Sequence, residues 1–317
     1  MYKRDDLFRK LLWEKIYLPR MAHKDRCDVL ISLYQSATVI SYTDMKHVMV
    51  VHDVIPRVFA EYLDNMRKKI YWHYVEKGIY ASHKIVTVSA YTQHDLEHLL
   101  HVKPQKMTTS LIAVDQLFTQ EISQKEMDRV MRTYHLTEGA YIYTGGGLEL
   151  RKGVDRILRA YKMLKSRYPD APKLVVSGKL MPQLAPLIID VEQIVLDLHL
   201  RDDVIVTDFV PQEDLPALYK GAKMFVYASL YEGFGLPPLE AMTVGTPVIT
   251  THNTSIPEVC KDAVVYAEEN DEDFARKMHE MLSDDTMIEE KRAAGAQRAA
   301  DFSWETFVHD VMDEATQ

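Results

Sequence analysis

Along most of the chain, short apolar runs rich in Val and Ile alternate with longer stretches in which apolar and polar residues recur at helical spacing. This alternation is typical of βα repeats whose parallel strands are buried on both faces. The pattern therefore predicts an α/β fold. The expected strands are 28–32, 47–51, 84–88, 140–144, 173–177, 204–207, 224–228 and 247–251.

The strand pattern stops between residues 113 and 138, where the chain becomes polar, and it then resumes. A length of 317 residues also exceeds the usual size of one domain. We therefore expect a first domain over 1–120, a second over 121–300, and a terminal helix over 301–317 anchored by Phe302 and Trp304. In parallel sheets of this kind, ligands bind beyond the carboxyl ends of the strands.

Charge and cysteine content exclude several classes of protein. A formal charge of -9 argues against nucleic acid as a partner, because nucleic-acid-binding proteins normally show a basic surface. The two cysteines, Cys27 and Cys260, lie outside any C-x-x-C pattern, so neither a disulfide framework nor a zinc site is expected. There is no apolar run long enough for a membrane span and no signal-peptide pattern. We expect a cytoplasmic protein.

The first candidate for chemistry is the loop "TGGGLELRKG", residues 144–153, between a predicted strand and a predicted helix. Its glycines can bring backbone N–H groups against a phosphate, while Arg151 and Lys152 add positive charge at the helix start. It is not a dinucleotide fingerprint, because Leu150 stands where the third glycine belongs, and no P-loop motif is present. From these residues alone, a glycine turn beside two solvated basic residues fits equally well.

The second candidate is "YEGFGLPPLE", residues 231–240, in which Glu232 precedes a glycine turn and Glu240 follows it. Glycine permits close approach to a ligand, and N–H groups at a helix start favour a diphosphate or a sugar hydroxyl. Glu240 can accept two hydrogen bonds from vicinal hydroxyls such as those of ribose, and Glu232 would face another polyol. Taken alone, the pair is better interpreted as a surface acid and a carboxylate that satisfies a helix dipole.

The stretch 208–259, which contains both glutamates, resembles the donor-binding half of retaining GT-B glycosyltransferases of family 4. Glu232 and Glu240 match the E-x7-E signature of that family. The segments "GGGLELRKGVDRILRAY", "VVSGK", "VVHDVIP" and "KIVTVSAYTQHDL" also resemble it, so the likeness spans nearly the whole chain. The resemblance implies two Rossmann-like domains that face each other across a cleft.

The resemblance also implies roles for individual residues. Arg151 and Lys152 would neutralise the donor β-phosphate and the leaving nucleoside diphosphate, Glu240 would bind the ribose, and Glu232 would hold the transferred hexose. The remaining donor-side residues would be Gly146 and Gly147 of the diphosphate loop, the amides of Gly233, Phe234, Gly235 and Leu236 beside the hexose, and the backbone of Val210 beside the base. Lys179 is either a phosphate contact or a solvated lysine. His52 would lie near the reacting sugar, although its sequence position alone favours a histidine at a strand end. From their positions, Asp53 is expected to cap a turn and Ser89 to cap a helix.

The activity implied is transfer of a hexose from a nucleotide sugar to a glycan or a lipid-linked acceptor. GDP-mannose is the first expectation and UDP-glucose the second, because "WEKIYLPR" and "SLYEGFGLPPLEAM" are similar to mannosyl-transferring members. Members retain the anomeric configuration by front-face attack, so no carboxylate nucleophile is required. We expect no cofactor and no metal, and "RDDV", 201–204, reads as a turn. The alternatives are a non-catalytic nucleotide-sugar-binding subunit and a sugar-nucleotide epimerase or hydrolase on the same fold.

The opening segment departs from the family pattern, because it resembles a part that lies well inside the usual amino-terminal domain. A shortened first domain, or one completed by a partner chain, is the expectation. Residues 1–24 are also basic, with Phe8, Leu12 and Ile16 at helical spacing. Such a helix either lies on the inner face of the membrane or packs on its own sheet, and we favour the second. The segment "MRKKIYWHY", 66–74, also mixes basic and aromatic residues and is a further candidate for a membrane or acceptor contact.

Overall fold

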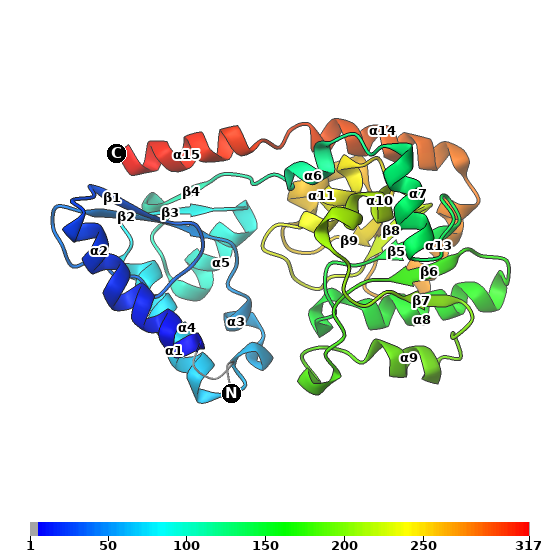
Figure 1. Cartoon of the computed structure of the whole chain (residues 1–317), viewed down its shortest axis with the longest axis horizontal. Coiled ribbons are helices and arrows are strands. Elements are labelled where there is room, and N and C mark those ends of the chain that lie inside the picture. The colour runs from blue at the N-terminus through cyan, green and yellow to red at the C-terminus, as the bar shows by residue number, and fades with distance from the viewer. Residues whose placement is uncertain (1–5, 317) are drawn as a thin grey trace. The chain divides into compact units, whose positions relative to one another are not determined.

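The computed structural model describes residues 6–316, which form two compact units (Figure 1). Unit 1 comprises Met1–Ile112 and Ser303–Gln317, and unit 2 comprises Ala113–Phe302. The sequence placed these divisions near residues 120 and 300, and it treated the terminal helix as separate from both domains. Lys3, Arg4 and Asp5 of the predicted basic helix lie outside the described residues.

Unit 1 contains a parallel sheet of four strands in the order β1-β2-β3-β4. Its core lies where Met49, Val51 and Ile85 of the sheet meet Trp72 and Ile79 of helix α4. The strands are β1 (Val29–Ser32), β2 (Lys46–Val51), β3 (Lys84–Thr87) and β4 (Met107–Thr109). The helices are α1 (Asp6–Leu12), the π-helical turn η2 (Trp13–Tyr17), α2 (Leu18–Lys24), α3 (Ile55–Val58), α4 (Met66–Ala81), α5 (Ala90–Leu100) and α15 (Trp304–Thr316), with short 3-10 turns at η3 (Ala60–Leu63) and η4 (Pro104–Lys106).

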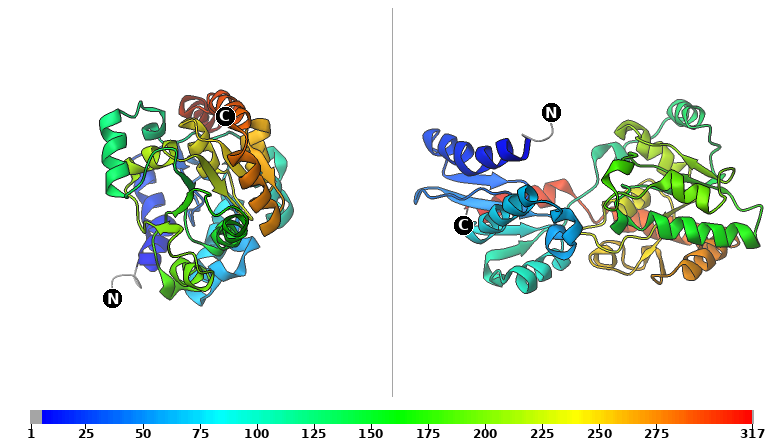
Figure 2. Two further views of the ribbon diagram at one scale, coloured as in Figure 1. Left: turned by 90° about the vertical axis from the view of Figure 1, so that its right-hand side faces the viewer. Right: turned by 90° about the horizontal axis from the view of Figure 1, so that it is seen from below.

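Unit 2 contains a parallel sheet of six strands, of which β5, β8 and β9 are buried along their whole length because helices lie on both faces (Figure 2). The strands are β5 (Tyr141–Thr144), β6 (Lys173–Val176), β7 (Val204–Val206), β8 (Met224–Tyr227), β9 (Val248–Thr251) and β10 (Val265–Ala267). The helices are α6 (Gln116–Thr119), α7 (Gln124–Thr133), α8 (Val154–Arg167), α9 (Val191–Asp197), α10 (Leu215–Lys220), α11 (Leu236–Thr243), α12 (Ile256–Cys260), α13 (Asp271–Leu282) and α14 (Asp285–Ala299).

The strand order of unit 2, β10-β9-β8-β5-β6-β7, contains one reversal of direction. From β5 the chain first adds β6 and β7 on one side, and it then returns to add β8, β9 and β10 on the other. This is the order of dinucleotide-binding folds, in which the loops after the two adjacent first strands diverge and leave a crevice for a ligand. The order therefore directs attention to the loops that follow β5 and β8.

The α/β fold predicted from the sequence is confirmed, and each of the eight expected strands is present with its ends shifted by at most one residue. The structure adds β4 and β10, two edge strands of three residues each. Runs this short carry too little periodicity to be told from a loop. Two local expectations also hold. Ser89 caps α5 by accepting a hydrogen bond from the backbone of Thr92, and Asp53 closes a turn by accepting one from Ile55.

The terminal helix α15 packs against β2 and β3 of unit 1, as its position beside that sheet in Figure 1 shows. Phe307, Val311 and Ala315 are its buried apolar residues, at the spacing of one helical face. The prediction that Trp304 anchors the helix is wrong, because this residue is 43% exposed. The other predicted anchor, Phe302, belongs to unit 2. The centres of the Phe302 and Phe234 rings lie 5.8 Å apart, and the rings are nearly perpendicular. Among residues 6–316, no helix is both long enough and apolar enough to cross a membrane.

Candidate functional site

The glycine-rich loop after β5 lies directly against the region after β8. A Cβ atom on Gly153 would sit 2.2 Å from the carbonyl oxygen of Ala228, and one on Gly146 would sit 2.8 Å from Cγ of Pro237. Both glycines also have positive φ values, +69° and +94°, which L side chains rarely adopt. Only glycine therefore allows this loop to approach β8 and the start of α11 so closely.

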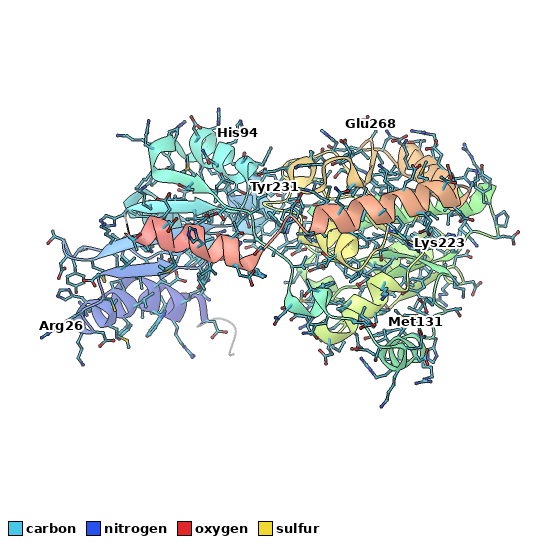
Figure 3. All side chains as sticks on the ribbon, turned by 90° about the horizontal axis from the view of Figure 1, so that it is seen from above. Arg26, His94, Met131, Lys223, Tyr231 and Glu268 are labelled. Atoms are coloured by element: carbon cyan, nitrogen blue, oxygen red, sulfur yellow. The ribbon has the colours of Figure 1, made fainter. Side chains whose placement is uncertain are left out.

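The loop after β8 is fixed in turn by hydroxyl groups that follow β9. Ser255 donates hydrogen bonds to the carbonyl oxygens of Glu232 and Phe234 at 2.9 and 2.7 Å, and Thr254 accepts one from the backbone N–H of Glu232 at 3.0 Å. The backbone N–H of Leu230 donates to the carbonyl of Arg151 at 2.8 Å, which joins the two loops. Tyr231, labelled in Figure 3, belongs to this same loop. The backbone around Glu232 is thus held on several sides before any side chain is considered.

Glu232 is the centre of a buried charge cluster at this edge of the sheet. Its Oε1 atom accepts hydrogen bonds from Arg151 at 2.9 Å, from Lys152 at 2.7 Å, from the Tyr227 hydroxyl at 2.6 Å and from the Ser229 hydroxyl at 2.7 Å. The side chains of Arg151 and Lys152 are only 10% and 8% exposed, and that of Glu232 is 9% exposed. Two cations and one carboxylate are therefore brought together out of water.

The charges set the protonation state of Glu232. Burial alone would raise the pKa of this carboxyl group, but Lys152 and Arg151 outweigh burial and lower the pKa to about 2. Glu232 is therefore ionised at neutral pH and holds both cations in place. Its charge stabilises the fold above the unfolded pKa of about 4.5, and this contribution is lost as the pH falls through about 2.

Tyr227 and Ser229 complete the cluster and were not identified from the sequence. Tyr227 ends β8, and its hydroxyl accepts a hydrogen bond from Lys152 at 2.7 Å while donating to Glu232. Burial and the neighbouring Glu232 charge raise the pKa of Tyr227, so the hydroxyl keeps its proton. The signal available in the sequence was a residue with a polar tip at the end of an apolar run, directly before the E-x7-E segment.

Glu240 lies on α11, one helical turn after the glycine turn, and is partly exposed. Its Oε2 atom accepts a hydrogen bond from the Tyr219 hydroxyl at 2.9 Å. Burial raises the pKa of Glu240 to about 7, although the Tyr219 hydrogen bond and the charge of Lys152 oppose the rise. Glu240 is therefore within electrostatic reach of Lys152, while its carboxylate is hydrogen-bonded to Tyr219.

The remaining predicted donor residues are distributed along the same edge of unit 2. Gly233, Phe234, Gly235 and Leu236 form the turn into α11, where Gly235 has a φ of +116°. Gly147, with a φ of +114°, lies in the loop after β5, exposed Lys179 lies after β6 and buried Val210 lies after β7. Within the part of the chain that the structure describes, no hydrogen bond joins Lys179 or Val210 to the Glu232 cluster.

His52, the other predicted catalytic residue, belongs to unit 1, where it directly follows β2. Its Nε2 atom lies 2.8 Å from the carbonyl oxygen of Leu33, and its backbone N–H donates to Gln35 at 3.2 Å. Because a carbonyl oxygen only accepts, Nε2 carries a proton in this contact. His52 is therefore fixed by the loop that follows β1.

The predicted turn over "RDDV" is confirmed, because residues 201–203 form a turn and Val204 begins β7. Across residues 6–316, no group of three or more His, Cys, Asp or Glu side chains is arranged to hold a metal ion.

Two protein families match this chain. Residues 111–301 match the family described as Glycosyl transferases group 1, and residues 2–115 match Glycosyltransferase Family 4. The first match contains the Glu232 cluster and Glu240, and the second contains His52.

Two mannosyltransferases of Escherichia coli are similar in sequence. The chain is 34% identical over 263 residues to the O-antigen chain mannosyltransferase B, covering 80% of this chain and 66% of that protein. It is 28% identical over 277 residues to the serotype-specific mannosyltransferase WbdA, covering 86% of this chain and 33% of that protein. The chain thus spans about two thirds of the length of the first relative and a third of the second.

Solved structures share the fold at low sequence identity. Sucrose-phosphate synthase from Thermosynechococcus elongatus matches with a TM-score of 0.77 at 17% identity, over 98% of this chain and 78% of that one. Anabaena Alr3699/HepE, solved in complex with UDP, matches with a TM-score of 0.73 at 13% identity, over 94% of this chain and 80% of that one. With its two parallel α/β units of the GT-B class, the chain belongs to the Glycosyl transferases group 1 family.

Proposed function

We propose that this protein transfers a hexose, with retention of configuration, from a nucleoside diphosphate sugar to a glycan or lipid-linked acceptor. The observation that carries the proposal is the convergence of Arg151 and Lys152 on one carboxylate oxygen at the reversal point of the unit 2 sheet. Two cations held out of water at this position favour binding of a diphosphate, because they attract a negative charge more strongly there than they would in solvent.

In the proposed reaction, the donor diphosphate takes over from Glu232 as the partner of Arg151 and Lys152. The two cations then stabilise the negative charge that develops on the leaving nucleoside diphosphate. Glu232, released from its cations but still held through Tyr227 and Ser229, accepts hydrogen bonds from the hexose hydroxyls. The N–H groups from Gly233 to Leu236 would help to position the same sugar, with His52 on the acceptor side.

The donor we propose is GDP-mannose, with UDP-glucose second. The sequence likeness to two mannosyltransferases supports mannose as the sugar. A structural relative that binds UDP supports a nucleoside diphosphate as the carrier. Glu240 would accept hydrogen bonds from the ribose hydroxyls, and the backbone of Val210 would contact the base.

We predict that the protein binds GDP-mannose more tightly than UDP-glucose. We also predict that its affinity for GDP-mannose rises as the pH is raised from about 6 to about 8. Ribose hydroxyls donate to the ionised form of Glu240, whose pKa in the free protein is about 7. If binding lowers this pKa by one unit, the affinity rises about fivefold over this range. The phosphates of a nucleotide sugar are diesters and do not titrate there, so calorimetry at several pH values isolates the Glu240 contribution.

Glu240→Gln is the matched variant, since it should remove the pH dependence, and Glu240→Ala should weaken binding at every pH. Equal affinity of these variants and the parent protein would exclude the assignment of Glu240 to the ribose.

An assay that follows the labelled sugar of the donor distinguishes transfer from the alternative functions. Binding without transfer would favour a non-catalytic subunit, and conversion of the free sugar nucleotide would favour an epimerase or hydrolase.

We predict that Glu232→Gln lowers the unfolding free energy by about 3–5 kcal/mol, because removing one partner leaves two buried cations without a counter-charge. GDP should then raise the melting temperature of this variant more than that of the parent protein, since a diphosphate restores the missing negative charge. Glu289→Gln is the control, as its pair with Arg292 is exposed and should change stability by less than about 0.5 kcal/mol. An equal or smaller GDP effect in Glu232→Gln would count against partner exchange.

Transfer should also proceed without a metal ion, because Arg151 and Lys152 supply the positive charge that the leaving group needs. Adding excess EDTA to a turnover assay should therefore leave the rate within about twofold of the untreated rate. Loss of activity that added Mg²⁺ or Mn²⁺ restores would contradict this part of the proposal.

The α1–η2–α2 segment is proposed to rest on the inner face of the membrane. Its buried residues Glu14, Pro19 and Ala22 pack inward, while Phe8, Trp13, Tyr17 and Met21 are 47–64% exposed. Exposed Arg20 and Lys24 lie one helical turn apart on this segment. Aromatic and basic side chains together suit the surface of an anionic bilayer.

The membrane proposal predicts that the protein sediments with phosphatidylglycerol vesicles and much less with phosphatidylcholine vesicles. Combining Trp13→Ser with Arg20→Glu should reduce sedimentation several-fold, because one apolar and one electrostatic contact are lost together. Trp304→Ser is the control, since Trp304 is a similarly exposed tryptophan on α15. Equal sedimentation with both lipids, or no difference between the variants, would refute the contact.

A further inference from the structure

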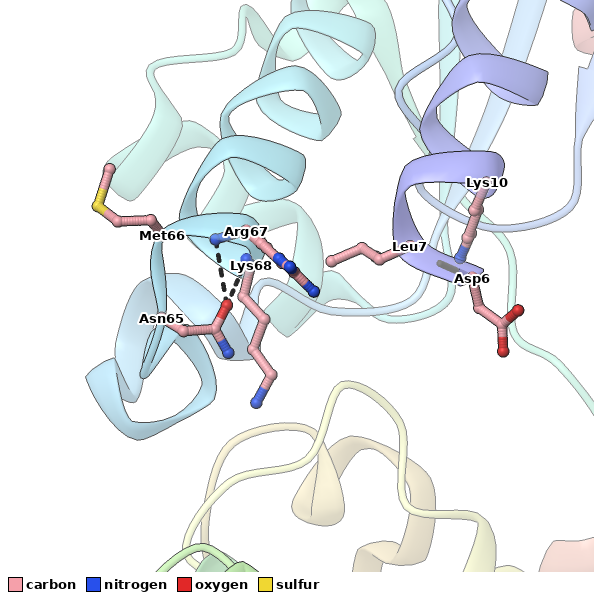
Figure 4. Close-up of a pocket in the computed structure, with 7 residues that line it drawn as sticks. All are labelled: Asp6, Leu7, Lys10, Asn65, Met66, Arg67 and Lys68. Atoms are coloured by element: carbon pink, nitrogen blue, oxygen red, sulfur yellow. Dashed lines mark hydrogen bonds between the residues drawn. The ribbon is translucent and has the colours of Figure 1, made fainter. Parts of the chain in front are cut away.

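Unit 1 contains a cavity of about 430 Å³ at the carboxyl ends of β1 and β2. Tyr34 follows β1 and His52 follows β2, and both line it. A second cavity of about 890 Å³ adjoins the first, because Leu7, Lys10 and Lys68 line both (Figure 4). Together they form a recess between α1 and the start of α4, at the edge of a parallel sheet where ligands bind.

The first cavity has a largely aromatic wall that is held in place by a buried carboxylate. Tyr34, Tyr62, Tyr71 and Trp72 line it. Glu14, which is only 3% exposed, accepts hydrogen bonds from the hydroxyls of Tyr34 at 3.1 Å and Tyr71 at 3.0 Å, and from the backbone N–H of Ala37 at 3.0 Å. Glu14 lies in the π-helical turn η2, a distortion that often occurs at functional sites. The rings of Tyr34 and Tyr71 are therefore held in place by Glu14 before a ligand arrives.

The recess is also positively charged. Lys10, Arg67 and Lys68 line it, against the single carboxylate of Asp6 among the described lining residues. The Nζ atom of Lys10 lies 4.6 Å from the centre of the Tyr34 ring and 5.2 Å from that of Tyr71, so one cation lies directly beside the aromatic wall. Within residues 6–316, Lys68 forms its ion pair with Asp64 at 3.0 Å, and both side chains are more than a third exposed. Exposed pairs of this kind are weak, so a phosphate can displace the carboxylate.

The indole of Trp72 supplies a further polar feature. Trp72 is 7% exposed, and its Nε1 donor has no hydrogen-bond acceptor among residues 6–316. A buried donor without a partner costs about 1–3 kcal/mol. An oxygen-rich ligand that comes close to this ring is therefore favoured over a purely apolar one.

From these features we infer that the recess binds a saccharide that carries a phosphate group, and that this is the acceptor class of the enzyme. The inference rests on the proposed transferase function. The sugar ring lies on the aromatic wall beside His52, and the phosphate lies between Lys10 and Lys68. A purely neutral glycan would gain little from the positive charge of Lys10 and Lys68, and a lipid tail would meet a charged opening.

The test is calorimetric titration of the full chain with glucose 1-phosphate, methyl glucoside and inorganic phosphate. Glucose 1-phosphate should bind at least tenfold more tightly than either fragment, because only it engages the aromatic wall and the lysines together. Lys68→Gln and Lys10→Gln should each weaken its binding about tenfold. Lys69→Gln is the matched control, as Lys69 is an exposed lysine of the same helix that does not line either cavity.

The aromatic contribution is tested separately. Tyr34→Phe keeps the ring and should retain most of the affinity for glucose 1-phosphate, whereas Tyr34→Leu should lose several-fold. A glucose 1-phosphate ester with an octyl chain distinguishes the source of the ligand. Tighter binding of the ester indicates a lipid-linked acceptor, and equal binding indicates a free sugar phosphate.

GDP-mannose affinity, measured on the same variants, separates failure of this inference from failure of the proposed function. Lys68→Gln should leave donor affinity unchanged, because the donor residues belong to unit 2. If GDP-mannose binds but glucose 1-phosphate binds no better than phosphate alone, or if Lys68→Gln and Lys69→Gln behave alike, the inference is overturned while the donor assignment stands. If glucose 1-phosphate binds as expected and no nucleotide sugar does, the transferase function is what fails.

Discussion

A buried carboxylate needs partners that compensate for the water it has lost, and in unit 2 the two cations that meet this requirement for Glu232 organise the loops around it. The free energy lost by removing Glu232 from water is recovered only if Arg151 and Lys152 reach Oε1 at hydrogen-bonding distance. Those cations come from the loop after β5, whereas Glu232 comes from the loop after β8. Gly153 is needed because any larger residue would collide with the backbone of Ala228 and hold the two loops apart.

The same arrangement explains how a structural ion pair can also act as a binding site. A buried pair contributes little net stability, because the cost of desolvation offsets the attraction between its charges. Replacing one anion by another therefore costs less than creating a new binding site for the cations. Tyr227 and Ser229 donate two further hydrogen bonds to Glu232, and under the proposed function these would remain when the cations change partner. Under the proposed function, the free protein holds the diphosphate site in a closed, neutralised form.

How much of this could be read from the sequence depends on how local each interaction is. The strands, the Ser89 cap and the 201–203 turn depend on residues close together in the chain, and the sequence predicted them. The pairing of Arg151 with Glu232 joins residues 81 positions apart, and it exists only because the sheet order makes β5 and β8 neighbours. The sequence identified both residues through a family resemblance, but it assigned them to different parts of the donor and missed their contact. Tyr227 was missed for the same reason, since its position in an apolar run indicates only a strand.

Unit 1 also depends on a buried carboxylate, and the contrast between Glu14 and Glu232 separates a structural acid from one that can exchange partners. Glu14 is held mainly by neutral donors, the hydroxyls of Tyr34 and Tyr71 and the N–H of Ala37, while Lys10 lies farther away at 3.7 Å and is partly exposed. An anionic ligand can attract Lys10, but it is not expected to replace Glu14. The Tyr34 and Tyr71 hydroxyls and the Ala37 N–H already donate to Glu14, and they would form no better hydrogen bonds with the ligand. Glu14 is therefore expected to stay in place while the lysines respond to the ligand. In unit 2 the strongest partners of the acid are themselves the cations. Under the proposed function, an incoming diphosphate would therefore change the surroundings of Glu232 and free this acid to contact the sugar.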